Sequence, residues 1–286
     1  MKQSIKNIFY EIVIFLLKLN FFKKIINLFV NAYFIDKGYC FDWSYLIGKS
    51  SNDLFKGENI FLSKFDSLKI KNCIDIGCNI GEFSKAILKN QNTKIVAFEP
   101  LPGCKKDLEQ IKQIYDSRFI YFECALSNKN GFDYINFGDK KSGLASLEKK
   151  INKIDYLDKV NKNSIKIELK KLNNFIDNDN FNNIDFIKID TEGHEFKVLE
   201  GGLDFIKKSN IKLIQIEFNR HHLFTNNTIN QFSEMLDNYI VTQMNLINGK
   251  LIEVDKNHYF SNLFQLSNFI FVKKDFFLEN KNNLLN

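Results

Sequence analysis

Residues 72–99 read NCIDIGCNIGEFSKAILKNQNTKIVAFE, and this stretch decides the fold. A short apolar run leads into a turn, a helical pattern follows, and a second apolar run ends on an acid. The turn carries Gly77, Asn79 and Gly81, and the acid is Glu99. A strand, a glycine turn, a helix, a strand and an acid are typical of a nucleotide-binding βαβ unit. Glycine lets the backbone approach a ligand closely, and a carboxylate at the strand tip can accept both ribose hydroxyls.

The spacing within the turn distinguishes between nucleotide cofactors. A dinucleotide fingerprint reads GxGxxG, whereas here Asp75 precedes Gly77-x-Asn79-x-Gly81 and no third glycine seats a pyrophosphate. The pattern DxGxxxG resembles the first motif of class I S-adenosylmethionine methyltransferases. A tight turn that binds no ligand would also explain the glycines, and an NAD-dependent oxidoreductase remains the alternative enzyme class.

The remaining apolar runs predict an α/β sheet over most of residues 70–275. Alternation of apolar and polar residues at 134–138 and 165–169 predicts antiparallel strands inserted before the fourth core strand. The fold class that we expect is a Rossmann-like class I methyltransferase sheet, mostly parallel, with an antiparallel C-terminal strand. Other strands are expected at 119–126, 185–190, 211–219, 250–254 and 269–273.

The length of 286 residues suits one large domain with an extra segment. We expect a helical N-terminal extension at 1–65, the methyltransferase domain at 66–275 with an inserted segment at 131–183, and a C-terminal tail at 276–286.

The N-terminal segment is rich in Ile, Leu and Phe with interspersed Lys. Glu11 and Lys18 interrupt it, so no uncharged span reaches the roughly 20 apolar residues that a membrane crossing needs. Amphipathic helices fit better. They would cover the catalytic domain, pair with a second chain, or touch the inner membrane peripherally through Lys23 and Lys24 beside Phe21 and Phe22.

Composition limits the partners. The net charge is +6, but the cations are nearly all Lys and form no basic run interleaved with aromatics, so we expect no nucleic-acid partner. The five cysteines are odd in number and lack metal-ligand spacing, which favours a reducing, cytoplasmic setting over a disulfide scaffold.

Ionisable residues gather where the parallel strands are expected to end. Ligands of such sheets bind outside the carboxyl ends of the strands, and unpaired buried carboxylates are costly, so the gathering predicts a site. The residues are Asp75, Glu99, Asp190 and Glu217, with Glu192 and His194 in the loop after the fourth strand.

Residues 184–202, IDFIKIDTEGHEFKVLEGG, resemble the signature segment of the FkbM family of methyltransferases, which typically shows KIDxEGxE followed by VLxG. The segments IDIGxNIG, AFEP and ALS match upstream in the expected order, as does IQIE downstream. The resemblance covers roughly residues 70–220. Thr191, where the family often carries Val, is a departure.

The resemblance implies an O-methyltransferase that uses S-adenosylmethionine and methylates a hydroxyl, with a sugar or glycan as the expected acceptor. The same fold without catalytic function, as a binding module, is a further alternative. The implied donor-binding residues follow the motifs. Asp75 and Gly77 would shape the methionine end, Asn79 and Gly81 open the turn, Glu99 with the adjoining Pro100 meets the ribose, and Ala125 and Leu126 flank adenine.

Removal of the acceptor proton needs a base. We expect His194 in this role, with Asp190 or Glu192 as an alternative or orienting partner and Glu217 completing the cluster. The same three acids would alternatively hold a divalent cation that polarises the hydroxyl, a version that we do not favour.

Overall fold

The computed structural model describes residues 55–286, except 91, 246–247, 265 and 286. By internal contacts the chain divides into Met1–Ser50 and Ser51–Asn286, and the fold below is that of the second unit. The expected helices, membrane contact and self-association at residues 1–54 lie outside the described residues. The described chain begins with helix α3 (Phe55–Ser63), whose Phe61 is fully buried in the core.

The centre of the unit is an eight-stranded sheet. In chain order its strands are β1 (Asn72–Ile76), β2 (Lys94–Phe98), β3 (Phe119–Phe122), β7 (Phe186–Ile189), β8 (Leu213–Phe218), β9 (Tyr239–Met244), β10 (Leu251–Glu253) and β11 (Ser267–Lys273). Their order in the sheet is β10-β9-β11-β8-β7-β1-β2-β3. All pairings from β3 to β8 are parallel, whereas β11 runs antiparallel to both β8 and β9. The predicted fold class, a mostly parallel α/β sheet with an antiparallel C-terminal strand, is confirmed.

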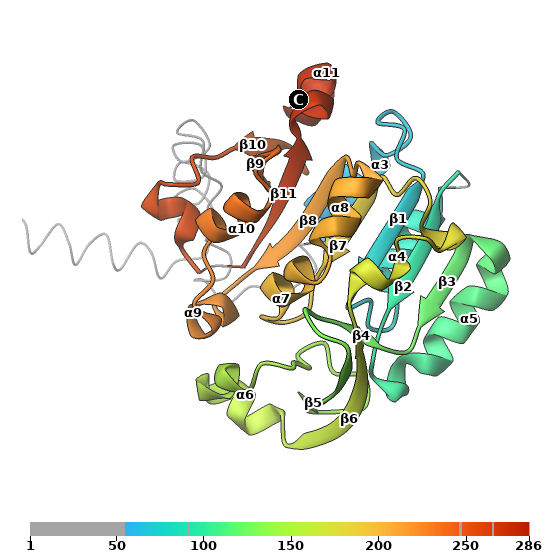
Figure 1. Ribbon diagram of the computed structural model, residues 1–286, viewed down its shortest axis with the longest axis vertical. Coiled ribbons are helices and arrows are strands. Elements are labelled where there is room, and N and C mark those ends of the chain that lie inside the picture. Colours follow the sequence, from blue (N-terminus) through green and yellow to red (C-terminus); the bar gives the residue numbers. More distant parts are fainter. Residues whose placement is uncertain (1–54, 91, 246–247, 265, 286) are drawn as a thin grey trace, which may run out of the picture. The chain divides into compact units, whose positions relative to one another are not determined.

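The order of the strands reverses beside β1. The chain passes from β1 to β2 and β3 on one side, and then returns to β7 and β8 on the other. Such a switch point opens a crevice outside the carboxyl ends of the strands, where open α/β sheets bind ligands. The turn after β1 and the loop after β7 meet there, as Figure 1 shows.

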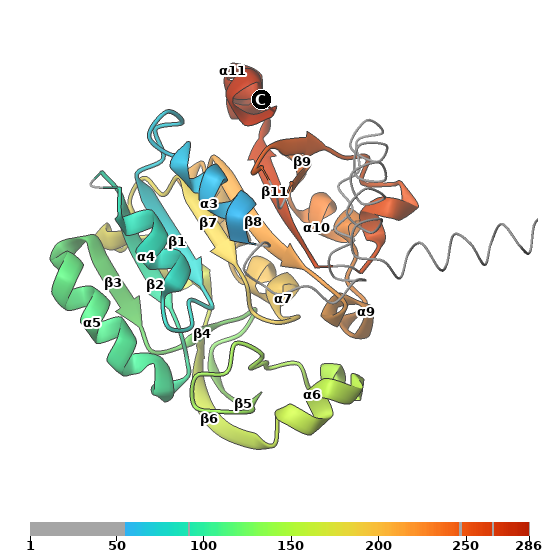
Figure 2. The ribbon, with the colours of Figure 1, turned by 180° about the vertical axis from the view of Figure 1, so that it is seen from behind.

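Helices cover both faces of the sheet (Figures 1 and 2). Cys73 belongs to the apolar cluster on one face and its neighbour Ile74 to the cluster on the other, because successive strand residues point to opposite faces. Strands that are buried on both sides read as continuous apolar runs, which is why they stand out in the sequence. The first face carries α3, α4 (Glu82–Leu88), α5 (Lys105–Tyr115) and α11 (Lys274–Leu285); the second carries α7 (Glu195–Glu200), α8 (Leu203–Ser209) and α10 (Ile229–Met235).

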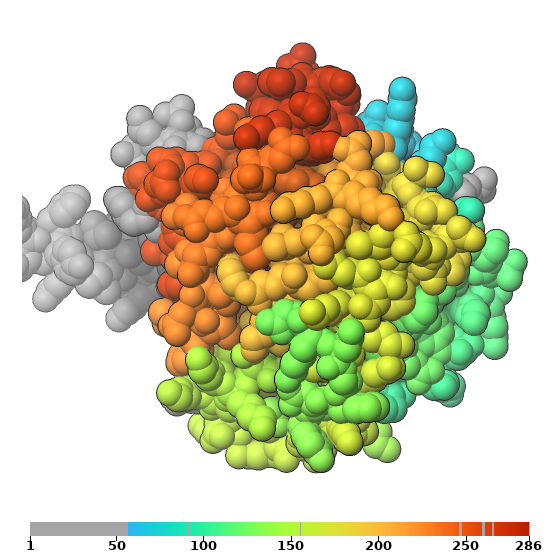
Figure 3. Space-filling model, viewed as in Figure 1, coloured from blue at the N-terminus to red at the C-terminus, as the bar shows by residue number. Residues whose placement is uncertain are grey.

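The inserted segment and β4 (Ala125–Leu126), which precedes it, form a second sheet with the order β4-β6-β5. The insertion contributes β5 (Gly131–Phe137) and β6 (Asn163–Lys170), with α6 (Asp155–Val160) between them. The antiparallel pairing of β5 with β6 confirms the two predicted inserted strands. In Figure 3 the insertion (green to yellow-green) packs against the neighbouring yellow and orange segments on this face.

The prediction of one continuous strand at 119–126 is wrong. β3 ends at Phe122, whose carbonyl accepts the Glu99 amide hydrogen at 3.1 Å, and the chain then bends at 123–124. β4 pairs with β6 of the insertion instead of extending the main sheet.

β9, α11 and the short helix α9 (His221–Thr225) were not predicted, because their sequences lack a clear apolar period. Across residues 55–286, leaving aside the gaps given above, no helix is long and apolar enough to span a membrane.

Candidate functional site

A cavity lies at the carboxyl ends of the strands beside the switch point. The turn after β1, the ends of β2 and β4, the loop after β7 and the insertion all contribute to its wall. Of the predicted donor-binding residues, it is lined by Gly77, Asn79, Glu99, Pro100, Ala125 and Leu126.

Gly77 lies where the turn after β1 packs against the residue that follows β7. Its φ is +81°, and a Cβ placed on it would lie 1.9 Å from the carbonyl oxygen of Asp190. Only glycine tolerates both the backbone conformation and the contact. The turn after β1 therefore lies directly on the end of β7, which brings Asp190 to the cavity.

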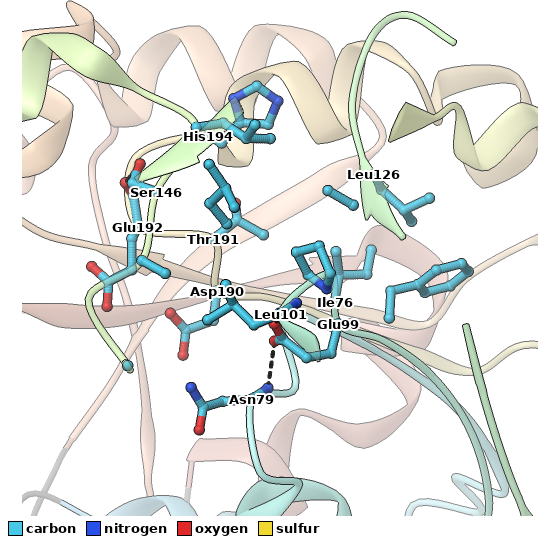
Figure 4. A pocket seen from close by; sticks show the side chains of 18 of the residues that line it. Ile76, Asn79, Glu99, Leu101, Leu126, Ser146, Asp190, Thr191, Glu192 and His194 are labelled. Atoms are coloured by element: carbon cyan, nitrogen blue, oxygen red, sulfur yellow. Dashed lines mark hydrogen bonds between the residues drawn. The ribbon is translucent and has the colours of Figure 1, made fainter. Parts of the chain in front are cut away.

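The Glu99 carboxylate lies on the cavity floor and is held by two backbone amides. The amide of Asn79 donates to Oε2 at 2.8 Å and that of Leu101 to Oε1 at 2.8 Å (Figure 4). The side chain is 6% exposed, and burial raises its pKa to about 7 even though the two amides favour the charged form. Each oxygen keeps a second acceptor site, which suits a vicinal diol such as ribose.

Asp75 does not line this cavity but a second one, which shares Gly77, Asn79 and Asp190 with the first. Ser84 donates to its Oδ2 at 2.6 Å, and its buried Oδ1 has no hydrogen-bond partner among the described residues. Lys188, which the sequence patterns did not single out, lies beside Asp75 on the neighbouring strand.

The Lys188 ammonium group forms a 2.5 Å ion pair with Asp190. Burial works against its charge, but the carboxylates of Asp190 and Asp75 hold its pKa above the usual range. A charged lysine in this place lets several carboxylates lie close together in the interior.

Gly81 lies elsewhere. It precedes α4 with a φ of +78°, and a Cβ placed on it would meet Ile111 of α5 at 2.3 Å. It lines neither cavity, so packing against α5 is the reason for glycine here.

Three predicted residues do come together. Carboxylate oxygens of Asp190, Glu192 and Glu217 lie within 4.8 Å of one another, and we refer to these residues as the acid corner. Burial and then the Asp190 charge raise the pKa of both Glu192 and Glu217. A proton or a divalent cation would relieve the repulsion, so the acid corner is the part of the described chain that could hold a metal ion.

His194 stands apart from the acid corner. Its Nδ1 lies 2.7 Å from Glu148 Oε1 and its Nε2 lies 2.9 Å from Ser127 Oγ, and the residue is 5% exposed. In Figure 4 its ring lies at the top of the view and points away from the carboxylates of Asp190 and Glu192. With both nitrogens engaged, His194 ties the insertion to the loop after β4, and the geometry does not favour it as the base.

Sequence reasoning missed a histidine that does contact the acid corner. His221 Nδ1 lies 2.8 Å from Glu192 Oε2, and His221 Nε2 lies 3.2 Å from the hydroxyl of Tyr156. Burial lowers the pKa of His221, so its ring is neutral near pH 7. The adjacent pair His221-His222 just after a strand was the available signal, but its partners come from distant parts of the chain.

The residues of this site fall within a segment that matches a known protein family. The family model described as the methyltransferase FkbM domain matches residues 75–264. No curated protein matches the sequence.

Solved structures with a similar fold include the methyltransferase domain of bacterial CtHen1-C, with 11% identity, 77% of this chain and 98% of that chain covered, and a TM-score of 0.43. Another is a putative caffeoyl-CoA O-methyltransferase from Staphylococcus aureus, with 12% identity, 86% of this chain and 99% of that chain covered, and a TM-score of 0.41.

The family match spans both sides of the switch point, from Asp75 to the strands that carry Asp190 and Glu217. The chain belongs to the FkbM family of methyltransferases.

Proposed function

We propose that this methyltransferase uses S-adenosylmethionine to methylate a hydroxyl of a sugar or glycan. The observation that carries the proposal is the placement of the amide-held Glu99 carboxylate and the acid corner on opposite sides of the switch point. A donor that spans the switch point would present its ribose to Glu99 and its sulfonium to Asp190.

The two cavities fit the two ends of such a donor. Ala125 and Leu126 offer an apolar slot in the first cavity for adenine, and Asp75 faces the second cavity with an unpartnered oxygen that would accept from the methionine ammonium. Gly77 and Asn79 line both cavities and would lie beneath the middle of the donor. S-adenosylmethionine supplies the methyl group when bound.

Charge supports a cationic ligand. The carboxylates that interact with buried Lys188 are those of Asp190, Asp75, Glu58 and Glu217. They outnumber the ammonium groups buried among them in the described part of the chain, so a positively charged sulfonium would be attracted to this position.

The acid corner would remove the proton of the acceptor hydroxyl. A carboxylate with a raised pKa is a stronger base than an ordinary one, and burial raises the pKa of both Glu192 and Glu217. We assign this role to Glu192, because it lines the donor cavity whereas both nitrogens of His194 are engaged.

The choice of a bacterial surface glycan or its precursor as acceptor rests on analogy within the family. Buried free cysteines such as Cys73 and Cys124 fit the reducing cytoplasm that we propose as the location.

Calorimetry tests the donor, and mass analysis tests the acceptor. We expect the full chain to bind S-adenosylhomocysteine and not NAD; binding of NAD alone would favour the oxidoreductase, and binding of neither would favour a non-catalytic module. Incubation with labelled donor and a panel of host glycans should then transfer the label to a sugar hydroxyl. Activity that disappears with EDTA and returns with Mg²⁺ would move the acid corner from base to metal site.

A further inference from the structure

Two adjacent histidines contact two glutamates that follow β7, Glu192 in the loop and Glu195 at the start of α7. His222 Nε2 lies 3.0 Å from Glu195 Oε2, and the side chains are 0% and 1% exposed. The other oxygen of Glu195 accepts the amide hydrogens of Thr191 at 2.7 Å and Gly193 at 3.2 Å. This pair lies in the core and holds the loop closed, so its role is structural.

The second pair differs because its glutamate faces the cavity. His221 Nδ1 lies 2.8 Å from Glu192 Oε2, and Glu192 lines the donor cavity and belongs to the acid corner. The other ring nitrogen of His221 lies 3.2 Å from the Tyr156 hydroxyl, which comes from α6 of the insertion. The guanidinium carbon of Arg220 lies 4.3 Å from the centre of the Tyr156 ring and stacks on it.

Packing fixes the histidine in this position. Gly193 has a φ of +95°, and a Cβ placed on it would lie 3.1 Å from the Cβ of His221 and 3.5 Å from Ile151 of the insertion. Glu192 itself has a φ of +53°, which is uncommon and costly for a residue other than glycine. A strained glutamate beside a confined, buried histidine indicates that the direction of the carboxylate matters.

We propose that His221 is a positioning residue for Glu192, because its Nδ1 lies against the Glu192 carboxylate and its Nε2 lies within hydrogen-bond distance of the Tyr156 hydroxyl. The ring is confined between these two groups, so it limits the directions that the Glu192 side chain can take and keeps the carboxylate at the donor cavity, where the acceptor hydroxyl would lie. This role rests on the proposed function, which assigns Glu192 the acceptor proton.

The test compares two donor analogues on the full chain and needs no acceptor. Sinefungin carries an amine where the donor carries its sulfonium methyl, whereas S-adenosylhomocysteine carries nothing there. We expect His221→Leu to reduce the preference for sinefungin about tenfold, as for one loosened charge-assisted contact, and to leave the Kd of S-adenosylhomocysteine unchanged. His221→Asn keeps a polar group near the position of Nδ1, against the Glu192 carboxylate, and should retain most of the preference.

The matched control is His222→Asn, which should lower the Tm without changing the preference. If His221→Leu has the same preference as the wild type while both bind S-adenosylhomocysteine, the positioning role is wrong. If the wild type binds neither analogue, the proposed function itself fails.

A spectroscopic signature decides the matter even if His221→Leu does not fold. The sequence has four histidines, so ¹⁵N ring shifts can be assigned by substitution. In the wild-type complex with S-adenosylhomocysteine, we expect the Nδ1 shift of His221 to change in Glu192→Gln and the Nε2 shift to change in Tyr156→Phe. If neither shift changes, the proposal is overturned.

Discussion

At the scale of single residues, the site depends on charges that are buried in close proximity. Glu99 and Lys188 show the two ways in which the protein accommodates them. Backbone amides hold the Glu99 carboxylate, yet burial still raises its pKa to about 7. Lys188 remains charged because Asp190 and Asp75 flank it. Each arrangement predicts a stability that depends on pH.

Glu99→Gln is expected to gain stability relative to the wild type as the pH rises. The wild-type carboxyl favours the fold fully below its ordinary pKa of 4.5, where it is neutral, and this contribution is lost as the pH rises through about 7. The free energy of unfolding of the wild type falls by about 3 kcal/mol in this way, and Glu99→Gln does not show the loss because its amide does not titrate. Urea unfolding of the ligand-free proteins at pH 5 and pH 8 measures the difference, and a difference that does not change with pH would contradict the assignment.

Lys188→Met is expected to destabilise the protein by about 3 kcal/mol at pH 8, because it leaves the Asp190 and Asp75 carboxylates without their cation. The penalty should shrink as the pH falls and these acids protonate. The control is Lys85→Met, which removes an exposed pair with Glu82 and should cost less than about 1 kcal/mol. If urea unfolding gave the same loss of free energy for both variants, the buried pair would stabilise the protein no more than the exposed one.

At the scale of elements, local patterns predicted most of the sheet and distant contacts account for what they missed. The apolar runs at β1, β2, β7 and β8 are visible because both faces of these strands are buried. The departure of β4 was not visible, since it depends on pairing with β6 far along the chain.

The residues of the candidate site also fall into those that local patterns predicted and those that depend on distant contacts. The glycine turn and the ends of the strands predicted Glu99 and the acid corner, because both follow from position in a parallel sheet. The contact between Tyr156 and His221 joins residues 65 apart, and no local period reports it. His194 is predicted as the base from its residue type and its place after the fourth strand, whereas its partners Ser127 and Glu148 come from other elements.

Hydrogen bonds hold one segment of the insertion beside the donor cavity. His194 bridges Ser127 to Glu148, and Ser146 Oγ donates to the Glu192 carbonyl at 2.7 Å, so these contacts fasten the segment 142–148 beside the donor cavity. His194→Ala should weaken S-adenosylhomocysteine binding about tenfold through faster release, as expected for losing a buried hydrogen-bonded bridge.

Hydrogen exchange and stopped-flow release measure this loosening. Exchange in segment 142–148 should quicken in His194→Ala. Lys129→Ala, which removes an exposed pair with Asp133 near the start of the insertion, should leave both measurements unchanged. Unchanged release from His194→Ala would mean that the bridge supports the fold without holding the donor.

At the scale of the whole molecule, the proposed donor would connect the two halves of the sheet. Gly77 and Glu99 belong to the half that contains β1 and β2, and Asp190 follows β7 on the other side of the switch point. A ligand that contacts both halves binds the native state alone and stabilises the cooperative unit. S-adenosylhomocysteine at one hundred times its Kd should therefore add about 2.7 kcal/mol and raise the Tm by roughly 5–10 °C.

Glu99→Ala distinguishes this linkage from general stabilisation by an additive. The variant loses the charged acceptor for the ribose hydroxyls, which should weaken binding about 100-fold, so the same ligand concentration should raise its Tm by only about 1–2 °C. NAD should shift neither protein. A large shift in Glu99→Ala would mean that the ligand binds away from the switch point.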